Sequence, residues 1–303
     1  MMRFPVHGWI GLAALVGSQT ALILQLDPLT THFYSFIWWP YILLVDGLIY
    51  YRRGSSLIIN RTREFFLLIP WSVVIWVTFE AFNLVLQNWY YIGVPKEIFF
   101  RWPGYFVAYG TVLPAIFETR ELLDTWQVFG QGRIKQVQVT ASWYAGFIIL
   151  GLTMLLLPLL WPLFAFPLVW GGFVFLLEPL NHHQGRPSLL RDLERGTLVN
   201  FYRLLLAGLI CGGLWEFWNF WAKAKWIYTV PWVGEVKLFE MPILGFLGFP
   251  PFAVECYVMA HFLKIYETDS AQKQWSWKAV PLWLLIYALM FWAIDQFTVR
   301  LYV

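Results

Sequence analysis

Four glutamates stand out because each lies within an apolar stretch long enough to cross a membrane. They are Glu80, Glu118, Glu216 and Glu255. An ionisable group inside a membrane segment costs roughly 2.5–3.5 kcal/mol or more, so each is a functional candidate by default. One interpretation is a proton donor, or a cation or substrate site, formed between two halves of the chain. The other is structural: Trp, Tyr and Asn donors would bind the carboxyl groups and hold the helices together.

Two of these glutamates have an asparagine three residues later, Glu80 with Asn83 and Glu216 with Asn219. Residues three apart share one face of a helix, so each amide could hold the adjacent carboxyl group. We take all four glutamates as candidate catalytic residues and the two asparagines as candidate substrate-binding residues.

Two Trp-x-Tyr segments are further substrate-binding candidates. Trp89 and Tyr91 form the first segment, Trp226 and Tyr228 the second, and a Val-Pro pair follows each one. Such segments are typical of an aromatic belt at the membrane interface. Because proline stops a helix, they could equally form a re-entrant lid over a cavity.

The remaining polar residues predict little chemistry. Asp46, Glu178 and Asp295 are expected near helix ends, with their carboxylates at the interface. The histidines are isolated apart from a pair expected to be solvated, and both cysteines lie in apolar stretches, so we predict no metal site. No motif identifies a cofactor, which stays unknown. The charges are spread over loops, which gives no support for nucleic-acid binding.

The elements that carry these residues are predicted to be membrane helices. The chain of 303 residues is 59% hydrophobic and 13% charged, with a mean hydropathy of +0.59. Soluble proteins carry about 25% charged residues. A spanning helix needs about 20 mostly apolar residues, and this criterion gives nine segments. They lie near 8–26, 33–51, 65–87, 103–122, 141–160, 163–180, 198–221, 242–264 and 279–299.

Positive charge alternates between the loops and predicts the orientation. Arginines and lysines gather after the second, fourth, sixth and eighth segments: Arg52, Arg53, Arg61, Arg63, Arg120, Arg133, Lys135, Arg186, Arg191, Arg195, Arg203, Lys264, Lys273 and Lys278. Loops rich in Lys and Arg lie in the cytoplasm. The N-terminus is therefore expected in the cytoplasm and the C-terminus outside, in what we take to be a bacterial or archaeal cytoplasmic membrane.

An internal repeat organises the chain. Residues 79–83 read FEAFN and residues 215–219 read WEFWN; a Trp-x-Tyr segment, a Val-Pro pair and a Pro-x-x-x-Glu sequence follow each in the same order. We predict an all-α polytopic protein with two parallel four-helix repeats, residues 1–137 and 138–268, and a ninth transmembrane helix within 269–303. The ninth helix would serve packing or bind a partner subunit.

The second Trp-x-Tyr region resembles the small integral-membrane lycopene cyclases of carotenoid synthesis. The similarity runs from Trp226-Ile227-Tyr228 through Gly245 and Pro251 to Glu255, over about a third of the chain when Trp89 to Glu118 is included. In that family a proline closely precedes two adjacent glutamates, whereas here a single glutamate follows after three intervening residues. The family's repeat also has three helices, not four.

If the resemblance holds, it implies that Glu118 or Glu255 protonates a polyene. Together with the aromatic-rich interior, this favours a membrane protein that binds or acts on a long apolar lipid, such as an isoprenoid or carotenoid, with a buried glutamate as the proton donor. Two alternatives stay open. The repeat and the glutamates also suit a proton-coupled transporter, and the unpaired ninth helix suits a non-catalytic subunit of a larger complex.

Overall fold

The computed structural model describes residues 3–130, 132–232, 236–263 and 280–300. Its helices are α1 (Val6–Ile23), α2 (Phe33–Arg53), α3 (Leu57–Asn60), α4 (Thr62–Leu86), α5 (Ile98–Tyr109), α6 (Val112–Thr125), α7 (Ala141–Leu160), α8 (Pro162–Ala165), α9 (Val169–His183), α10 (Leu189–Glu194), α11 (Val199–Trp221), α12 (Phe249–Phe262) and α13 (Val280–Phe297). Short 3₁₀ helices are η1 (Phe166–Leu168) and η2 (Ile243–Gly248). The strands are β1 (Trp89–Ile92), β2 (Lys225–Tyr228), β3 (Lys237–Leu238), β4 (Met241–Pro242) and β5 (Val299–Arg300).

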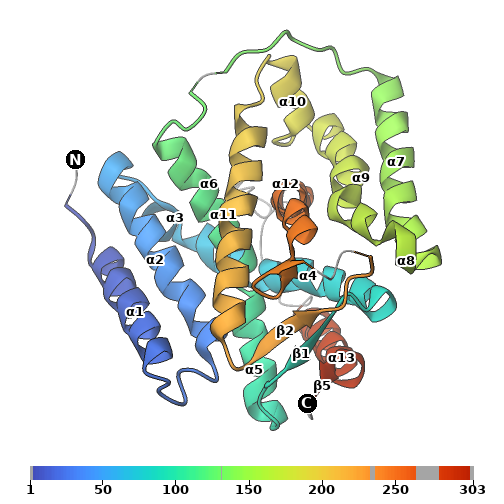
Figure 1. Ribbon diagram of the computed structural model, residues 1–303. Coiled ribbons are helices and arrows are strands. Elements are labelled where there is room, and N and C mark those ends of the chain that lie inside the picture. The colour runs from blue at the N-terminus through green and yellow to red at the C-terminus, as the bar shows by residue number, and fades with distance from the viewer. Residues whose placement is uncertain (1–2, 131, 233–235, 264–279, 301–303) are drawn as a thin grey trace.

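The expected all-α membrane architecture is confirmed in its main feature. Within the described ranges, eight helical stretches are long and apolar enough to cross a membrane. Seven of the described helices pack in the spatial order α1, α2, α6, α11, α12, α9, α7. Helix α4 packs on α6, and α13 packs on α4. In Figure 1, α12 and α13 are seen nearly end-on while α11 lies in the plane of the view, so the bundle contains steeply crossing helices.

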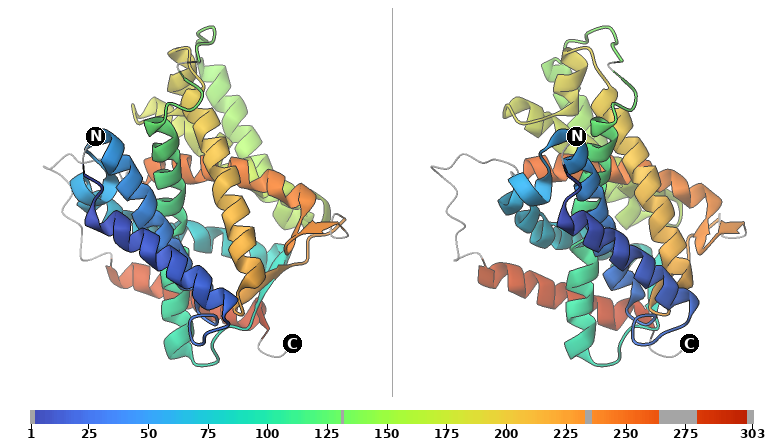
Figure 2. Two further views of the ribbon diagram at one scale, coloured as in Figure 1. Left: turned by 60° about the vertical axis from the view of Figure 1, so that its left-hand side comes forward. Right: turned by 90° about the vertical axis from the view of Figure 1, so that its left-hand side faces the viewer.

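The expected fourth segment, 103–122, is divided between α5 and α6. The break at Gly110 and Thr111 lies just before Pro114, which lacks an N–H for the carbonyl of Gly110 and whose ring crowds that carbonyl, so a continuous helix is disfavoured there. The hydroxyl of Ser72 in α4 bridges the break: it donates to the Tyr109 carbonyl at 2.5 Å and accepts from the Leu113 N–H at 3.0 Å. Figure 2 shows the two helices one above the other.

Small residues allow the closest helix contacts. Gly8 of α1 and Gly47 of α2 face one another, and a Cβ added to Gly47 would come within 2.7 Å of the Gly8 Cα. On α11, a Cβ at Gly212 would lie 2.2 Å from the Phe249 ring of α12. Without a hydrophobic driving force between helices in lipid, such close packing is the main source of their association.

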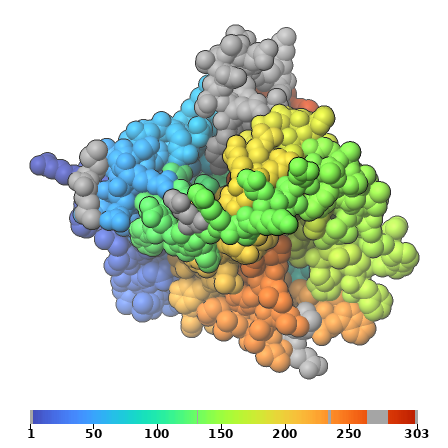
Figure 3. All heavy atoms as spheres, turned by 90° about the horizontal axis from the view of Figure 1, so that it is seen from above, coloured from blue at the N-terminus to red at the C-terminus, as the bar shows by residue number. Residues whose placement is uncertain are grey.

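The basic loops lie toward one end of the molecule. The C-terminal ends of α2 and α6, and helix α10, are drawn near the end that carries the N label, while C lies at the other end (Figure 1). Arg133 and Thr197 form an isolated β-bridge that joins two of these loops. Seen from above, the blue and cyan segments of the first half and the yellow-green segments of the second half occupy opposite sides (Figure 3). Lys264, Lys273 and Lys278, and the expected domain boundary near 268, lie outside the described residues.

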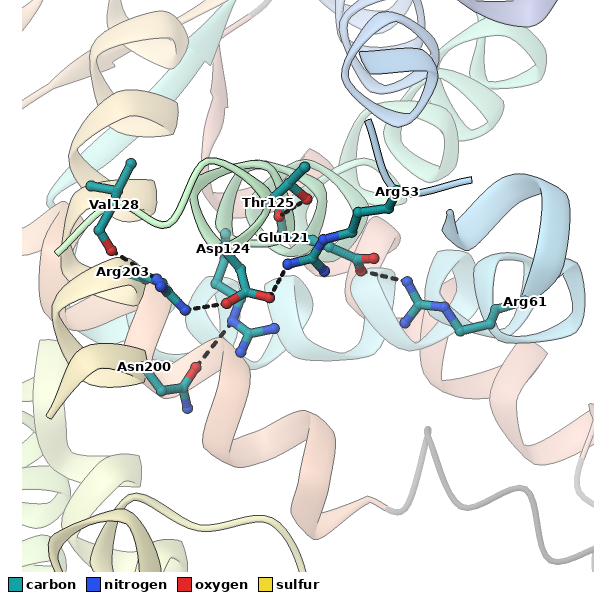
Figure 4. Close-up of polar contacts among 9 residues, drawn as sticks. Arg53, Arg61, Glu121, Asp124, Thr125, Val128, Asn200 and Arg203 are labelled. Carbon is teal, nitrogen blue, oxygen red and sulfur yellow. Dashed lines mark hydrogen bonds and ion pairs between the residues drawn. The ribbon is translucent and has the colours of Figure 1, made fainter. Parts of the chain in front are cut away.

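An ion network joins four elements at this basic end (Figure 4). The Asp124 carboxylate of α6 accepts from Arg53 at the end of α2 and from Arg203 of α11. Glu121 accepts from Arg61, the residue before α4, and Arg203 also donates to the Val128 carbonyl at 3.0 Å. The network therefore fixes the ends of helices from both halves to one another.

Candidate functional site

A cavity of about 490 Å³ lies beside the paired strands β1 and β2. Its wall comes from α4, α5, α9, α11, η2 and α12 as well as from both strands. Aromatic side chains dominate the lining, among them Trp76, Trp89, Tyr109, Trp170, Trp215 and Phe252. Phe252 is central to this wall, because its ring lies edge-on to those of Trp76, Phe79 and Trp170.

The two Trp-x-Tyr segments form an antiparallel strand pair in the cavity wall. Trp89 is the partner of Tyr228, and Tyr91 is the partner of Trp226. All four side chains line the cavity, so the structure brings these four predicted substrate-binding residues together. Trp89 and Tyr91 are also buried. The two segments thus form one part of the cavity wall.

The two asparagines hold the ends of these strands and are absent from the cavity lining. Asn83 donates to the Trp89 carbonyl at 2.9 Å, and its side-chain oxygen accepts from the N–H groups of Asn88 and Trp89. Asn219 makes the same reciprocal pair of bonds, both 2.9 Å long, with the backbone of Trp226. Both amides therefore fix the turn from helix to strand.

Glu80 and Glu216 lie behind the aromatic wall. One oxygen of Glu80 accepts from the indoles of Trp76 and Trp89, at 3.0 and 3.1 Å, and from the hydroxyl of Tyr91. Glu216 accepts from the Tyr228 hydroxyl at 2.7 Å. Neither glutamate is exposed or lines the cavity. The polar groups of Trp76, Trp89, Tyr91 and Tyr228 are thus bound by carboxyl groups outside the lining, which hold these four wall residues in place.

Glu118 and Glu255 lie in two other places. Glu118 lies in α6, and neither of its carboxyl oxygens has a hydrogen-bond partner among the described residues. Glu255 of α12 accepts from the backbone N–H of Phe173 at 2.9 Å. Both glutamates are fully buried, and neither lines the cavity.

The N–H that binds Glu255 is available because α9 is kinked. Trp170 has a ψ of 37°, outside the helical range, so the regular hydrogen bonding of α9 is interrupted immediately before Phe173. Glu255 also lies three residues after Phe252, on the same face of α12. A carboxyl group is therefore held one helical turn from a residue of the cavity wall.

Asp46 and Glu178 were expected at the interface and are instead buried. Each accepts a hydrogen bond from the backbone N–H twelve residues later, Asp46 from Ile58 at 2.8 Å and Glu178 from Leu190 at 2.9 Å. Those N–H groups lie in the first turns of α3 and α10. Backbone N–H groups in the first turn of a helix have no hydrogen-bond acceptor within that helix. The carboxylates thus fix two short helices on the basic side of the molecule.

An ion pair between α5 and α13 was not predicted. Arg101 lines the cavity, and Asp295 accepts from its Nε and Nη2 at 2.8 and 2.7 Å. Trp102 and Tyr105 also donate to Asp295, each at 2.9 Å. Asp295 was expected at the interface and is instead buried in this pair. No sequence signal joins residues 194 positions apart.

Of the histidine pair, His183 is exposed as expected, whereas His182 is partly buried. His182 lies between the Tyr144 hydroxyl, 2.7 Å from Nδ1, and the Glu194 carboxylate, 3.0 Å from Nε2. The Glu194 pKa is held below its usual value by the hydrogen bond from His182. Over the described residues, no three His, Cys, Asp or Glu side chains gather as metal ligands would. Cys211 and Cys256 are buried thiols.

Comparison of the chain with protein-family models, with curated proteins and with solved structures finds no match. The functional argument therefore rests on the cavity and on the groups that surround it.

Proposed function

We propose that this integral membrane protein binds a long apolar lipid, of the isoprenoid or carotenoid type, in the aromatic cavity. The observation that carries the proposal is the construction of the wall: large aromatic side chains line the cavity, and four of them bind Glu80 or Glu216 outside the lining through their polar groups. Small-molecule sites are mostly apolar cavities of about 300–1,000 Å³. The volume of about 490 Å³ lies within that range.

The rim of the cavity suits entry from the bilayer. Phe100 of α5 and Leu244 and Leu247 of η2 line the cavity and are 57%, 60% and 70% exposed. Apolar side chains that face lipid carry no free-energy penalty, because lipid tails are as apolar as the side chains. An apolar molecule could therefore pass between them without contacting water. A lipid dissolved in the membrane could therefore reach the lumen sideways.

For the chemistry, we propose a buried glutamate as the proton donor. We choose Glu255 first because it lies one turn from Phe252 of the cavity wall. Its second oxygen has no hydrogen-bond partner among the described residues, a feature that it shares with Glu80, Glu118 and Glu216. Transfer of its proton to a double bond would leave a glutamate anion and a carbocation. The cation could then cyclise or add water, with the proton returned to the carboxylate. Glu118 is the corresponding candidate in the first half.

Turnover tests this chemistry directly. Glu255→Gln and Glu118→Gln keep the size of the side chain but remove the transferable proton, so conversion of a bound polyene should be lost while the lipid remains bound. Conversion retained in both variants would exclude these two residues as the acid.

We also propose that α5 and α6 together complete nine crossings, with the N-terminus in the cytoplasm. The two halves would be related as repeats, which is supported by the matched bonds of Asn83 and Asn219, of Glu80 and Glu216, and of Asp46 and Glu178. Cysteine-labelling from each side of the membrane tests the orientation.

Lipid extraction tests the binding proposal. Protein purified gently from its native membrane should carry a polyene or quinone near one per chain, detected by absorption and by mass spectrometry of the organic extract. Ordinary phospholipid alone would contradict the proposal and favour a proton-coupled transporter or a subunit of a larger complex.

A matched pair of glycine variants places the lipid in the cavity. Gly104 lines the cavity and Gly146 lies on the exposed face of α7; both are helical, and a Cβ at either would meet open space. Gly104→Phe should remove the copurified lipid by filling the lumen, whereas Gly146→Phe should leave it bound. Loss from both variants, or from neither, would place the lipid elsewhere.

A further inference from the structure

The cavity wall contains an arginine whose charge is fully compensated inside the protein. Arg101 is 6% exposed, and its partner Asp295 is 8% exposed. Four hydrogen bonds occupy the guanidinium: two to the Asp295 carboxylate, one to the Pro95 carbonyl at 2.8 Å and one to the Lys96 carbonyl at 2.6 Å. Arginine has five N–H groups, so at most one is left for a ligand.

Asp295 is equally occupied. Besides Arg101, the Trp102 indole and the Tyr105 hydroxyl donate to it, so three side chains of α5 converge on one carboxylate of α13. Figure 2 shows α13 running across α5 near the end of the molecule marked C. The bidentate geometry is the strongest form of an arginine–carboxylate pair, and it makes the pair neutral as a unit.

The second cation of the lining is compensated in the same way. Lys225 of β2 donates to the Glu240 carboxylate at 2.7 Å and to the Phe220 carbonyl at 3.3 Å. The other ionisable nitrogen side chain of the lining is His32, whose ring packs edge-on against Phe36. Arginine and lysine thus each face the cavity with a carboxylate already bound.

We infer that Asp295 is a specificity residue: by neutralising Arg101 at the cavity wall, it makes the site select lipids with an uncharged head group or none. This inference rests on the proposed lipid binding. A phosphate or carboxylate in the lumen would lose its hydration and find no uncompensated cation, which is the costly case for a buried charge. The same arginine without its aspartate would present a phosphate-binding fork.

Two ligands that share one chain separate these cases. Geranylgeraniol and geranylgeranyl phosphate are titrated into the purified protein in nanodiscs, with quenching of the cavity tryptophans as the readout. Gly104→Phe, whose lumen is filled, corrects for partition into the bilayer. The wild-type protein should bind the alcohol about tenfold more tightly than the phosphate, or better.

Asp295→Asn should raise the affinity for the phosphate about tenfold and leave the alcohol nearly unchanged, since the shape of the wall is kept but the arginine is uncompensated. The double variant Arg101→Gln, Asp295→Asn removes both charges and should restore the preference for the alcohol. If Asp295→Asn does not fold, Glu240→Gln provides a second test. This variant removes the carboxylate that binds Lys225, so it should likewise raise the affinity for the phosphate.

Equal affinity of the wild type for the two ligands would overturn the inference while leaving lipid binding intact. A parallel fall in both affinities in Asp295→Asn would also overturn it, because that result would mean that Asp295 only supports the wall. If neither ligand binds the wild type above the Gly104→Phe reference, the proposed function itself fails.

Discussion

Tyr91 and Tyr228 lie on neighbouring antiparallel strands, and the hydroxyl of each donates to a buried glutamate of the helix that precedes its own strand. Each tyrosine is paired across the strands with the tryptophan of the other segment. The arrangement is self-complementary, as at the interface of a symmetric dimer. The cavity therefore lies where the two halves of the chain meet.

Removing these hydroxyl groups should destabilise the protein to different extents. When Tyr91 becomes Phe, Glu80 keeps two indole donors. When Tyr228 becomes Phe, Glu216 loses the one hydroxyl donor that it has among the described residues. We expect losses of about 1 kcal/mol for Tyr91→Phe and about 2 kcal/mol for Tyr228→Phe. Unfolding in mixed detergent micelles measures both.

The neighbouring Tyr90 gives the matched control. Its ring lies under the Arg300 guanidinium at 3.7 Å, a contact that Tyr90→Phe retains. This variant should unfold like the wild type. If Tyr228→Phe also left the free energy of unfolding unchanged, the hydrogen bond to Glu216 would not contribute to stability.

The two asparagines should differ in the same assay. Asn83 makes three hydrogen bonds to the backbone and Asn219 makes two. Replacement by Ala leaves the buried backbone groups unpaired, so we expect Asn83→Ala to cost about 1 kcal/mol more than Asn219→Ala. Lipid binding should weaken in both variants, because the strands that cover the cavity lose their anchor; unchanged stability in Asn83→Ala would contradict this.

Asp124 should be the most sensitive position of the ion network. Asp124→Asn leaves Arg53 and Arg203 without their shared carboxylate, and Arg203 is only 10% exposed. We expect a loss of about 1–3 kcal/mol in the free energy of unfolding. The double variant Arg53→Gln, Asp124→Asn should recover part of this loss, since it removes one unpaired charge. No recovery would mean that the Arg53 charge, once unpaired, does not destabilise the protein.

Acid should weaken a contact at the opposite end of the molecule. The Asp27 pKa is held below its ordinary value by the hydrogen bond from the Lys223 ammonium, with further bonds from Thr30 and Thr31. A depressed carboxyl pKa contributes stability above the unfolded-state value of about 4 and loses it as the pH falls toward the folded-state value. In Asp27→Asn, the Tm between pH 5 and pH 3 should therefore fall less steeply than in the wild type.

High salt should reduce this difference, because both partners are about half exposed and exposed ion pairs are screened. Superimposable Tm profiles for the variant and the wild type at low salt would show that the contact does not contribute to stability.

The class of the protein and the identity of its unusual residues could be predicted from the sequence. The low fraction of charged residues and the long apolar runs are typical of helices that span a membrane. The ordered recurrence of Glu, Asn, Trp and Tyr singled out Trp89, Tyr91, Trp226 and Tyr228, all of which line the cavity. These signals are local, since they depend only on hydropathy and spacing along the chain.

The positions of those residues relative to one another depend on the packing of the folded chain. The pairing of β1 with β2, the position of Glu80 and Glu216 behind the wall, and the bond from Arg101 to Asp295 all join segments far apart in the chain. Spacing cannot show whether a buried carboxyl group faces a lumen or its wall, because both positions are equally apolar in sequence. The choice depends on helix packing, including the break at Pro114 and the kink at Trp170, which turn particular side chains toward or away from the cavity.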